Sequence, residues 1–172
     1  MKRILVYFIS IILLTSFFYL IFKNISLIKQ KEKLENSAQN IPLEFELYKL
    51  TGEVFKFKNF NLSKPIIIIH FNTECEYCHH ELKSVIENIK KLNEFNIVCI
   101  SSEKPSIIEQ FIAEQKINYP QNLIFLSDKK KKFFYYFGTS AIPSTFMYGV
   151  DGKLKYKQLG EVSANALLTW SK

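Results

Sequence analysis

The sequence IIIIHF at residues 66–71 is the feature that most limits how this chain can fold. It is an unbroken apolar run after Pro65, which is typical of a strand buried on both faces of a sheet. Cys75 and Cys78 follow closely, and apolar residues then recur at three- and four-residue steps, which predicts an amphipathic helix. These apolar positions are Leu82, Val85, Ile86, Ile89 and Leu92. We therefore expect Cys75 at the start of a helix that follows a central strand, with Cys78 in its first turn.

The rest of the pattern alternates strands and helices. Residues 43–58 are typical of a hairpin that turns at Thr51 and Gly52, and Asp151 with Gly152 forms a second hairpin turn signal. Further elements are expected as strands at 96–100, 123–127, 144–150 and 153–159, and as helices near Pro105, over 131–137 and from Ser163. The predicted fold class is α/β, a mixed β-sheet flanked by helices.

An uncharged run, residues 4–22, precedes this pattern. Its length is close to the roughly 20 residues that cross a bilayer as a helix, and no small-residue cleavage motif follows it. We expect residues 1–22 to be an uncleaved transmembrane signal anchor, residues 23–40 a polar stalk and residues 41–172 the folded domain. A cleaved signal peptide is the alternative.

The orientation of this anchor is less constrained by charge, because lysines lie on both sides of the apolar run. We place the domain on the extracytoplasmic, periplasmic side, because short basic N-terminal anchors usually translocate the rest of the chain. Disulfides also persist in such oxidising compartments.

The net charge of +7 raises the question of an anionic partner. Residues 1–40 hold six basic and two acidic residues, a charge of +4, so the remainder carries only +3. The densest basic run, residues 129–132, lacks the interleaved aromatics and glycine-rich context of nucleic-acid surfaces. We expect no nucleic-acid partner, and a solvated loop or helix start at the basic run.

The hexapeptide CEYCHH at residues 75–80 fits more than one chemistry. Two cysteines separated by two residues and followed by histidine match both c-type haem attachment, with His79 as an iron ligand, and a redox dithiol. Haem usually needs a second axial ligand, and Met147, the only methionine after the first residue, lies in a predicted strand. A copper- or zinc-binding module that uses the cysteines, His79 and His80 is a further alternative. A peroxidase is disfavoured, because Arg3 is the only arginine.

A dithiol directly after a buried strand, together with IPSTF at residues 142–146 entering a late strand, resembles the thioredoxin superfamily. The nearest likeness is to membrane-anchored, extracytoplasmic TlpA/ResA-type thiol-disulfide oxidoreductases, and it covers residues 41–171. The resemblance implies protein thiols and disulfides as substrates, a membrane protein as electron donor, and no cofactor.

The resemblance also assigns roles to individual residues. It implies that Cys75 is the attacking thiolate and that Cys78 resolves the mixed disulfide. Pro143, with a cis peptide bond, is expected to face the two cysteines, and Ile142 before it to contact the substrate. Cis bonds are a minority of X-Pro bonds, so the isomer follows from the resemblance and not from propensity.

One departure from the family pattern concerns proton transfer. The buried acid often found six residues before the first cysteine is Ile69 here, so the usual proton acceptor for the second thiol is missing. The candidates for proton transfer or tuning are Glu74, Glu76 and His79, with His80 as a further one.

The charges near the cysteines act in opposite directions. A helix N-terminus lowers the pKa of a thiol at the position of Cys75, whereas the flanking Glu74 and Glu76 disfavour its thiolate. A less stabilised thiolate makes a dithiol that gives up electrons more readily, so we expect a reductant. His70 is expected to be a core histidine with a satisfied ring, and Cys99 a buried, inert thiol.

Overall fold

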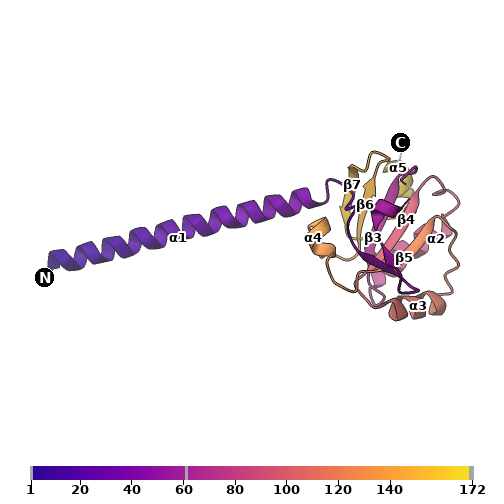
Figure 1. Ribbon diagram of the computed structural model, residues 1–172, viewed down its shortest axis with the longest axis horizontal. Coiled ribbons are helices and arrows are strands. Elements are labelled where there is room, and N and C mark those ends of the chain that lie inside the picture. The colour runs from indigo at the N-terminus through magenta and orange to yellow at the C-terminus, as the bar shows by residue number, and fades with distance from the viewer. Residues whose placement is uncertain (1, 61, 171–172) are drawn as a thin grey trace. The chain divides into compact units, whose positions relative to one another are not determined.

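The computed structural model describes residues 2–60 and 62–170 (Figure 1). The chain divides into two compact units, Met1–Asn36 and Ser37–Lys172. The first is part of a single helix, α1 (Lys2–Ser37). Among the residues described, α1 is the one helix long and apolar enough to cross a membrane by length and composition, over Ile11–Lys29 with a mean hydropathy of 2.0.

Helix α1 extends through most of the segment expected to be a polar stalk, residues 23–40. Lysine, glutamate, leucine and glutamine are frequent there and are good helix formers, and no proline interrupts them. The sequence predicts an apolar run at residues 4–22, and the side chains at its start lie outside the described residues. Among the described residues the apolar stretch covers Ile11–Lys29.

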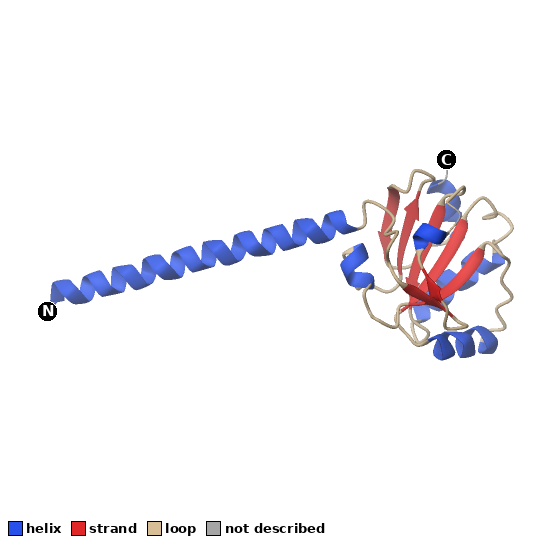
Figure 2. Ribbon diagram, viewed as in Figure 1, coloured by secondary structure: helices blue, strands red, loops and turns tan. Residues whose placement is uncertain are grey.

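The second unit is built on a seven-stranded mixed sheet with the order β2-β1-β5-β4-β3-β6-β7 (Figure 2). Its strands are β1 (Leu47–Lys49), β2 (Val54–Phe55), β3 (Ile66–Phe71), β4 (Asn96–Ser101), β5 (Leu123–Ser127), β6 (Ser144–Tyr148) and β7 (Leu154–Leu159). Strands β3, β4 and β5 are parallel, and β6 is antiparallel to β3. The ends of β3, β4 and β5 and the start of β6 therefore lie at one edge of the sheet, which we call the carboxyl edge.

Helices cover both faces of the sheet, and the predicted α/β fold is confirmed. Helices α2 (Glu76–Glu87), α3 (Pro105–Glu114) and α5 (Ala164–Trp170) share one buried cluster with one face of β3. The short helix α4 (Phe133–Phe137) and the chain around residues 38–57 share the other cluster. All six residues of β3 are buried, because apolar layers lie on both of its faces.

The first hairpin is shorter than its alternating pattern predicts. Strands β1 and β2 pair in the register Leu47 with Phe55. The chain turns before β1, where the N–H of Phe45 donates to the carbonyl of Pro42 at 3.0 Å, and a 3-10 helix, η1 (Phe57–Asn59), follows β2. Phe45 and Phe57 are nevertheless fully buried. The alternation of apolar and polar residues in this segment therefore predicts correctly which side chains are buried, but not how long the strands are.

The chain directly after α1 is bonded to the domain. The hydroxyl of Tyr148 donates to the carbonyl of Ala38 at 2.8 Å, and the N–H of Leu154 donates to the carbonyl of Gln39 at 2.9 Å. Ala38 is 1% exposed. This segment, expected to belong to the stalk, is therefore part of the domain and lies beside the start of β7.

Candidate functional site

Cys75 and Cys78 are joined by a disulfide, with a Cα–Cα distance of 5.2 Å. Cys75 is the N-cap residue of α2, and its sulfur accepts a hydrogen bond from the N–H of Cys78 at 3.2 Å. The two sulfurs differ in access, because Cys78 is fully buried whereas Cys75 is half-buried. A helix N-terminus with unbonded N–H groups stabilises a thiolate, so the reduced Cys75 is placed to be the accessible nucleophile.

The loop before Cys75 is held by Glu103, which lies just after β4. The N–H and the hydroxyl of Thr73 donate to the two carboxylate oxygens of Glu103 at 2.9 and 2.7 Å. The hydroxyl of Ser101 donates to the same carboxylate at 2.8 Å. Two hydrogen bonds thus tie the approach to the disulfide to Glu103, and the third holds the Glu103 carboxylate to the end of β4.

His79 is bound to the same loop. Its Nε2 lies 2.6 Å from the carbonyl oxygen of Thr73, and since a carbonyl only accepts, this nitrogen carries the proton. The ring packs against Phe111 with a centroid distance of 5.1 Å. His80 is exposed and lies 3.9 Å from the carboxylate of Glu161. The structure therefore gives His79 a contact that positions the loop, and proton transfer by His79 stays a prediction.

Glu74 and Glu76 both lie on the surface. The N–H of Glu74 donates to the side-chain oxygen of Asn72 at 2.8 Å, which forms a turn before the cysteines. Tyr77, between the two cysteines, is 64% exposed. Two exposed carboxylates and one exposed aromatic ring are thus the immediate sequence neighbours of the cysteines.

The Ile142-Pro143 peptide bond is cis, the isomer that the resemblance implied. Pro143 directly precedes β6, which is antiparallel to β3, so it lies at the carboxyl edge together with the cysteine loop. Pro143 is buried and Ile142 is 41% exposed. The carboxyl edge thus brings together two segments that are far apart in the sequence.

His70 is buried at 4% exposure, as expected, but its ring is only half satisfied. Its Nδ1 lies 3.4 Å from the carbonyl of Ala141, while its Nε2 has no partner among the described residues. Its ring stacks on Phe133 of α4 at 3.9 Å. Burial lowers the pKa of His70 to about 4, so the ring is neutral near pH 7.

Glu81 is a buried carboxylate that was not among the residues expected to act in proton transfer. It lies on α2, three residues after Cys78, and is fully buried. The hydroxyl of Thr145 donates to one of its oxygens, and the N–H of Val162 donates to the other at 3.2 Å. Burial raises the pKa of Glu81 to about 7, with a further contribution from the negative charge of Glu161.

Glu81 places a carboxyl group against Thr145, the cross-strand neighbour of Ile69. Thr145, its hydrogen-bond partner, lies directly opposite Ile69 across β3 and β6. A carboxylate therefore reaches this part of the sheet from the helix and not from the strand. One sequence signal could have identified Glu81. It lies at helical spacing from Cys78, Leu82 and Val85, and these three residues of the buried face of α2 are all apolar.

The third cysteine, Cys99, is free and fully buried in β4. Burial raises the pKa of its thiol, and Glu81 adds to this effect, so Cys99 stays protonated and inert as expected. Among the described residues, no three histidine, cysteine, aspartate or glutamate side chains are grouped to hold a metal ion.

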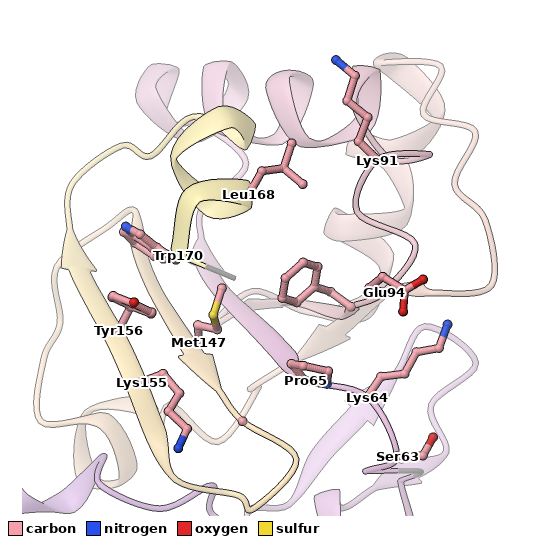
Figure 3. A pocket seen from close by; sticks show the side chains of 12 residues that line it. Ser63, Lys64, Pro65, Lys91, Glu94, Met147, Lys155, Tyr156, Leu168 and Trp170 are labelled. Atoms are coloured by element: carbon pink, nitrogen blue, oxygen red, sulfur yellow. The ribbon is translucent and has the colours of Figure 1, made fainter. Parts of the chain in front are cut away.

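A cavity of about 640 Å³ lies away from the cysteines (Figure 3). Its lining includes Pro65, before the start of β3, together with Met147 of β6 and Leu168 and Trp170 of α5. Since β3 leads from Pro65 to the cysteine loop, this cavity is at the opposite edge of the sheet and is separate from the disulfide.

Solved structures with the same fold include several redox proteins. StoA from Bacillus subtilis has a TM-score of 0.59 and 19% identity, and the match covers 74% of this chain and 96% of that one. The exposed lipoprotein thioredoxin of Streptococcus pneumoniae has a TM-score of 0.59 and 20% identity, with 74% and 97% covered. A secreted Mycobacterium tuberculosis disulfide oxidoreductase homologous to E. coli DsbE has a TM-score of 0.60 and 17% identity, with 81% and 96% covered.

No curated protein sequence matches the chain. The model of the AhpC/TSA family matches residues 38–157, which include both cysteines, Glu81 and the Ile142-Pro143 bond. This match spans more than half of the sequence and nearly all of the sheet. The chain belongs to the AhpC/TSA family and has a thioredoxin-like thiol-disulfide oxidoreductase fold with a CxxC-spaced cysteine pair.

Proposed function

We propose that this protein is a membrane-anchored, extracytoplasmic thiol-disulfide oxidoreductase that reduces disulfides of other proteins through Cys75 and Cys78. The observation that carries the proposal is the asymmetry of the pair. Cys75 is half-buried at the start of α2, whereas Cys78 is fully buried, with the buried Glu81 one turn further along the helix. This arrangement fits one attacking thiol and one resolving thiol.

The reaction begins with the reduced pair. The thiolate of Cys75 attacks a substrate disulfide, so that the substrate S–S bond breaks, a mixed disulfide forms and one substrate thiolate leaves. Cys78 then loses its proton to the carboxylate of Glu81 and attacks the sulfur of Cys75, which releases the second substrate thiolate. The substrate gains two electrons, and Cys75 and Cys78 lose them as their disulfide forms. A dithiol on a membrane protein returns the pair to its reduced form.

Carboxylates around α2 favour a reductant. Glu74 and Glu76 flank Cys75 in the sequence, and Glu81 is enclosed in the helix face that carries Cys78. Negative charge near a thiol disfavours its thiolate, which destabilises the reduced form at neutral pH. The reduced pair then gives up its electrons more readily, and we expect a reduction potential closer to about −270 mV than to about −120 mV.

Substrate contacts are proposed for Ile142 and Pro143, which lie at the same edge as the disulfide. Ile142 and Tyr77 both expose much of their apolar surface there. Such side chains fit an unfolded or extended protein segment around a cysteine, because they offer contact area without demanding one sequence.

Anchoring and location are part of the same proposal. The stretch Ile11–Lys29 of α1 has the length and composition of a membrane span. The similar proteins include an exposed lipoprotein and a secreted oxidoreductase. A dithiol enzyme outside the cytoplasm needs electrons from across the membrane, which supports a membrane protein as the donor.

The haem and metal alternatives have less support. His79 is hydrogen-bonded to Thr73 and packed on Phe111, so it is not directed toward an open iron site. Met147 is 3% exposed and pairs with Ile67, near the opposite edge of the sheet.

A redox titration tests the proposal. The purified protein is equilibrated with dithiothreitol couples of known ratio, and thiols are counted by mass-tagging. We expect Cys75 and Cys78 to interconvert as a two-electron pair while Cys99 stays unlabelled until the protein unfolds. Cysteines that do not interconvert would exclude the activity, and a potential near about −120 mV would exclude the reductant role alone.

A further inference from the structure

The loop between β5 and α4 carries a basic run next to exposed aromatic rings. All four lysines at residues 129–132 are exposed. The helix that follows buries Phe133 and Phe137 in the core, but Phe134 is 40% exposed and Tyr135 is 73% exposed. Basic residues beside exposed aromatic rings are the composition of surfaces that bind the headgroup region of a bilayer.

Two of the four lysines are already engaged within the protein. Lys129 lies over the ring of Tyr48 at 3.5 Å, and Lys130 forms an ion pair with Glu46. In the described part of the chain, neither Lys131 nor Lys132 has a carboxylate within ion-pair distance. Even when Glu46 and Asp128 are both counted as ionised, four lysines leave the loop with a local charge of +2. The loop therefore keeps two lysines for an external anion.

The loop lies at the same edge of the sheet as the redox pair. Strand β5 is parallel to β4 and β4 to β3, so residues 128–132 follow the carboxyl edge. The hydroxyl of Ser127 donates to the carbonyl of Glu103, the residue that holds Thr73 before Cys75. A surface bound by this loop would therefore lie close to the cysteine loop.

We propose that residues 129–135 form a membrane-contact surface that binds anionic lipid headgroups and turns the carboxyl edge toward the bilayer. Each lysine near an anionic surface contributes about 1 kcal/mol, or about fivefold in the docked population. Lys131 and Lys132 together then contribute about 30-fold, too little to recruit a free protein firmly. An effect of about 30-fold is enough for a domain that α1 already holds at the membrane, because the anchor makes the contact between loop and lipid intramolecular.

This docking depends on the membrane anchoring proposed above, but not on the redox chemistry. Full-length protein is reconstituted into nanodiscs of phosphatidylcholine with phosphatidylglycerol, or of phosphatidylcholine alone. The reporter is the indole of a Tyr135→Trp variant in a Trp170→Phe background, and the quencher is a brominated acyl chain. Trp170 of the unaltered chain is the reference, because it lies at the opposite edge, stacked on Tyr156.

We expect quenching of the Tyr135→Trp reporter in the anionic nanodiscs, and little in neutral ones or at about 1 M salt, where screening extends only about 3 Å. The double variant Lys131→Gln/Lys132→Gln should lower the docked population about 30-fold. The control Lys155→Gln/Lys157→Gln removes the same charge from exposed positions on β7 and should retain the quenching.

Equal quenching in neutral and anionic nanodiscs overturns the proposal. No quenching in either also overturns it, and an acidic protein would then be the partner that binds the loop. Loss of quenching with the β7 control also overturns it, because net charge and not this loop would then be responsible. Exchange of the Cys75–Cys78 disulfide with dithiothreitol should be the same in every variant, which shows that the domain is folded. Failure of the chain to enter nanodiscs would instead count against the anchor.

Discussion

Replacing Glu81 with glutamine should change how the stability of the domain depends on pH. The carboxyl group is buried between Thr145 and Val162, and burial raises its pKa from 4.5 to about 7. Below pH 4.5 the group is protonated in both the folded and the unfolded chain. Between pH 4.5 and about 7 the folded chain alone keeps the proton, so the free energy of unfolding falls as the pH rises.

The size of this effect follows from the shift in the pKa. A rise from 4.5 to about 7 corresponds to about 3 kcal/mol between the limits, of which about 2.5 kcal/mol falls between about pH 5 and pH 8. Glutamine has no proton to lose in this range. It also offers only one oxygen to the two donors, and this lost hydrogen bond lowers the stability of the variant by a further amount that does not itself depend on pH.

The assay is urea unfolding of the oxidised domain from Ser37, which contains both buried clusters, at about pH 5 and pH 8. The native domain should lose about 2.5 kcal/mol more than Glu81→Gln between these two conditions. Glu161→Gln is the matched control, because its side chain is 38% exposed and its removal should leave most of the pH dependence. Equal pH dependence in the native domain and in Glu81→Gln would refute a buried carboxyl with a raised pKa.

The same substitution has a kinetic readout that a purely structural role does not move. If Glu81 accepts the proton of Cys78, the release of substrate from the mixed disulfide should accelerate as the pH rises through about 7. In Glu81→Gln this rise should shift toward the pKa of an unassisted thiol. The rate is measured by stopped flow with a mixed disulfide between Cys75 and a fluorescent thiol.

Cys78→Ser should accumulate a mixed disulfide between Cys75 and substrate, visible on a non-reducing gel, because no thiol remains to resolve it; an equal adduct with Cys75→Ser would contradict the assigned roles. Glu103→Ala should cost about 1–3 kcal/mol in urea unfolding and speed hydrogen exchange at the N–H of Thr73, which loses its acceptor. Glu103→Gln should retain part of this protection. Leu82→Ala should cost about 2–5 kcal/mol in thermal or urea unfolding, since Leu82 is 1% exposed in the core under α2; a loss below about 1 kcal/mol would show that the site collapses.

Features set by local pattern could be predicted from the sequence. The apolar run IIIIHF forms the central strand β3, and the cysteines lie at the start of the amphipathic helix α2. Both follow from the spacing of apolar residues along a short stretch, which decides strand or helix and the face that is buried. The turn at Asp151 and Gly152 is equally local, and Gly152 has the positive φ of 69° that such a turn requires.

Features set by contacts between distant segments could not be predicted from the sequence. The environment of Glu81 depends on Thr145 and Val162, which lie more than 60 residues away. Thr145 reaches α2 through the pairing of β6 with β3, and Val162 follows β7, which pairs with β6. The contact of Glu103 with Thr73 likewise requires two neighbouring parallel strands to end together. Helical periodicity places Glu81 on the buried face of α2. Only the fold shows which donors form hydrogen bonds with its carboxyl group and so reduce the cost of burying it.

The bonded segment after α1 also limits how the domain could be shed from a membrane by proteolysis. Proteases bind an extended stretch of several residues, and buried, hydrogen-bonded backbone resists such binding. Ala38 is buried beneath Tyr148, and Gln39 accepts a hydrogen bond from Leu154, so this stretch must leave β7 before it can be cut. A cut before Ser37 lies in α1 and requires only that this helix unwinds locally, and the fragment released there would retain both buried clusters and the redox disulfide.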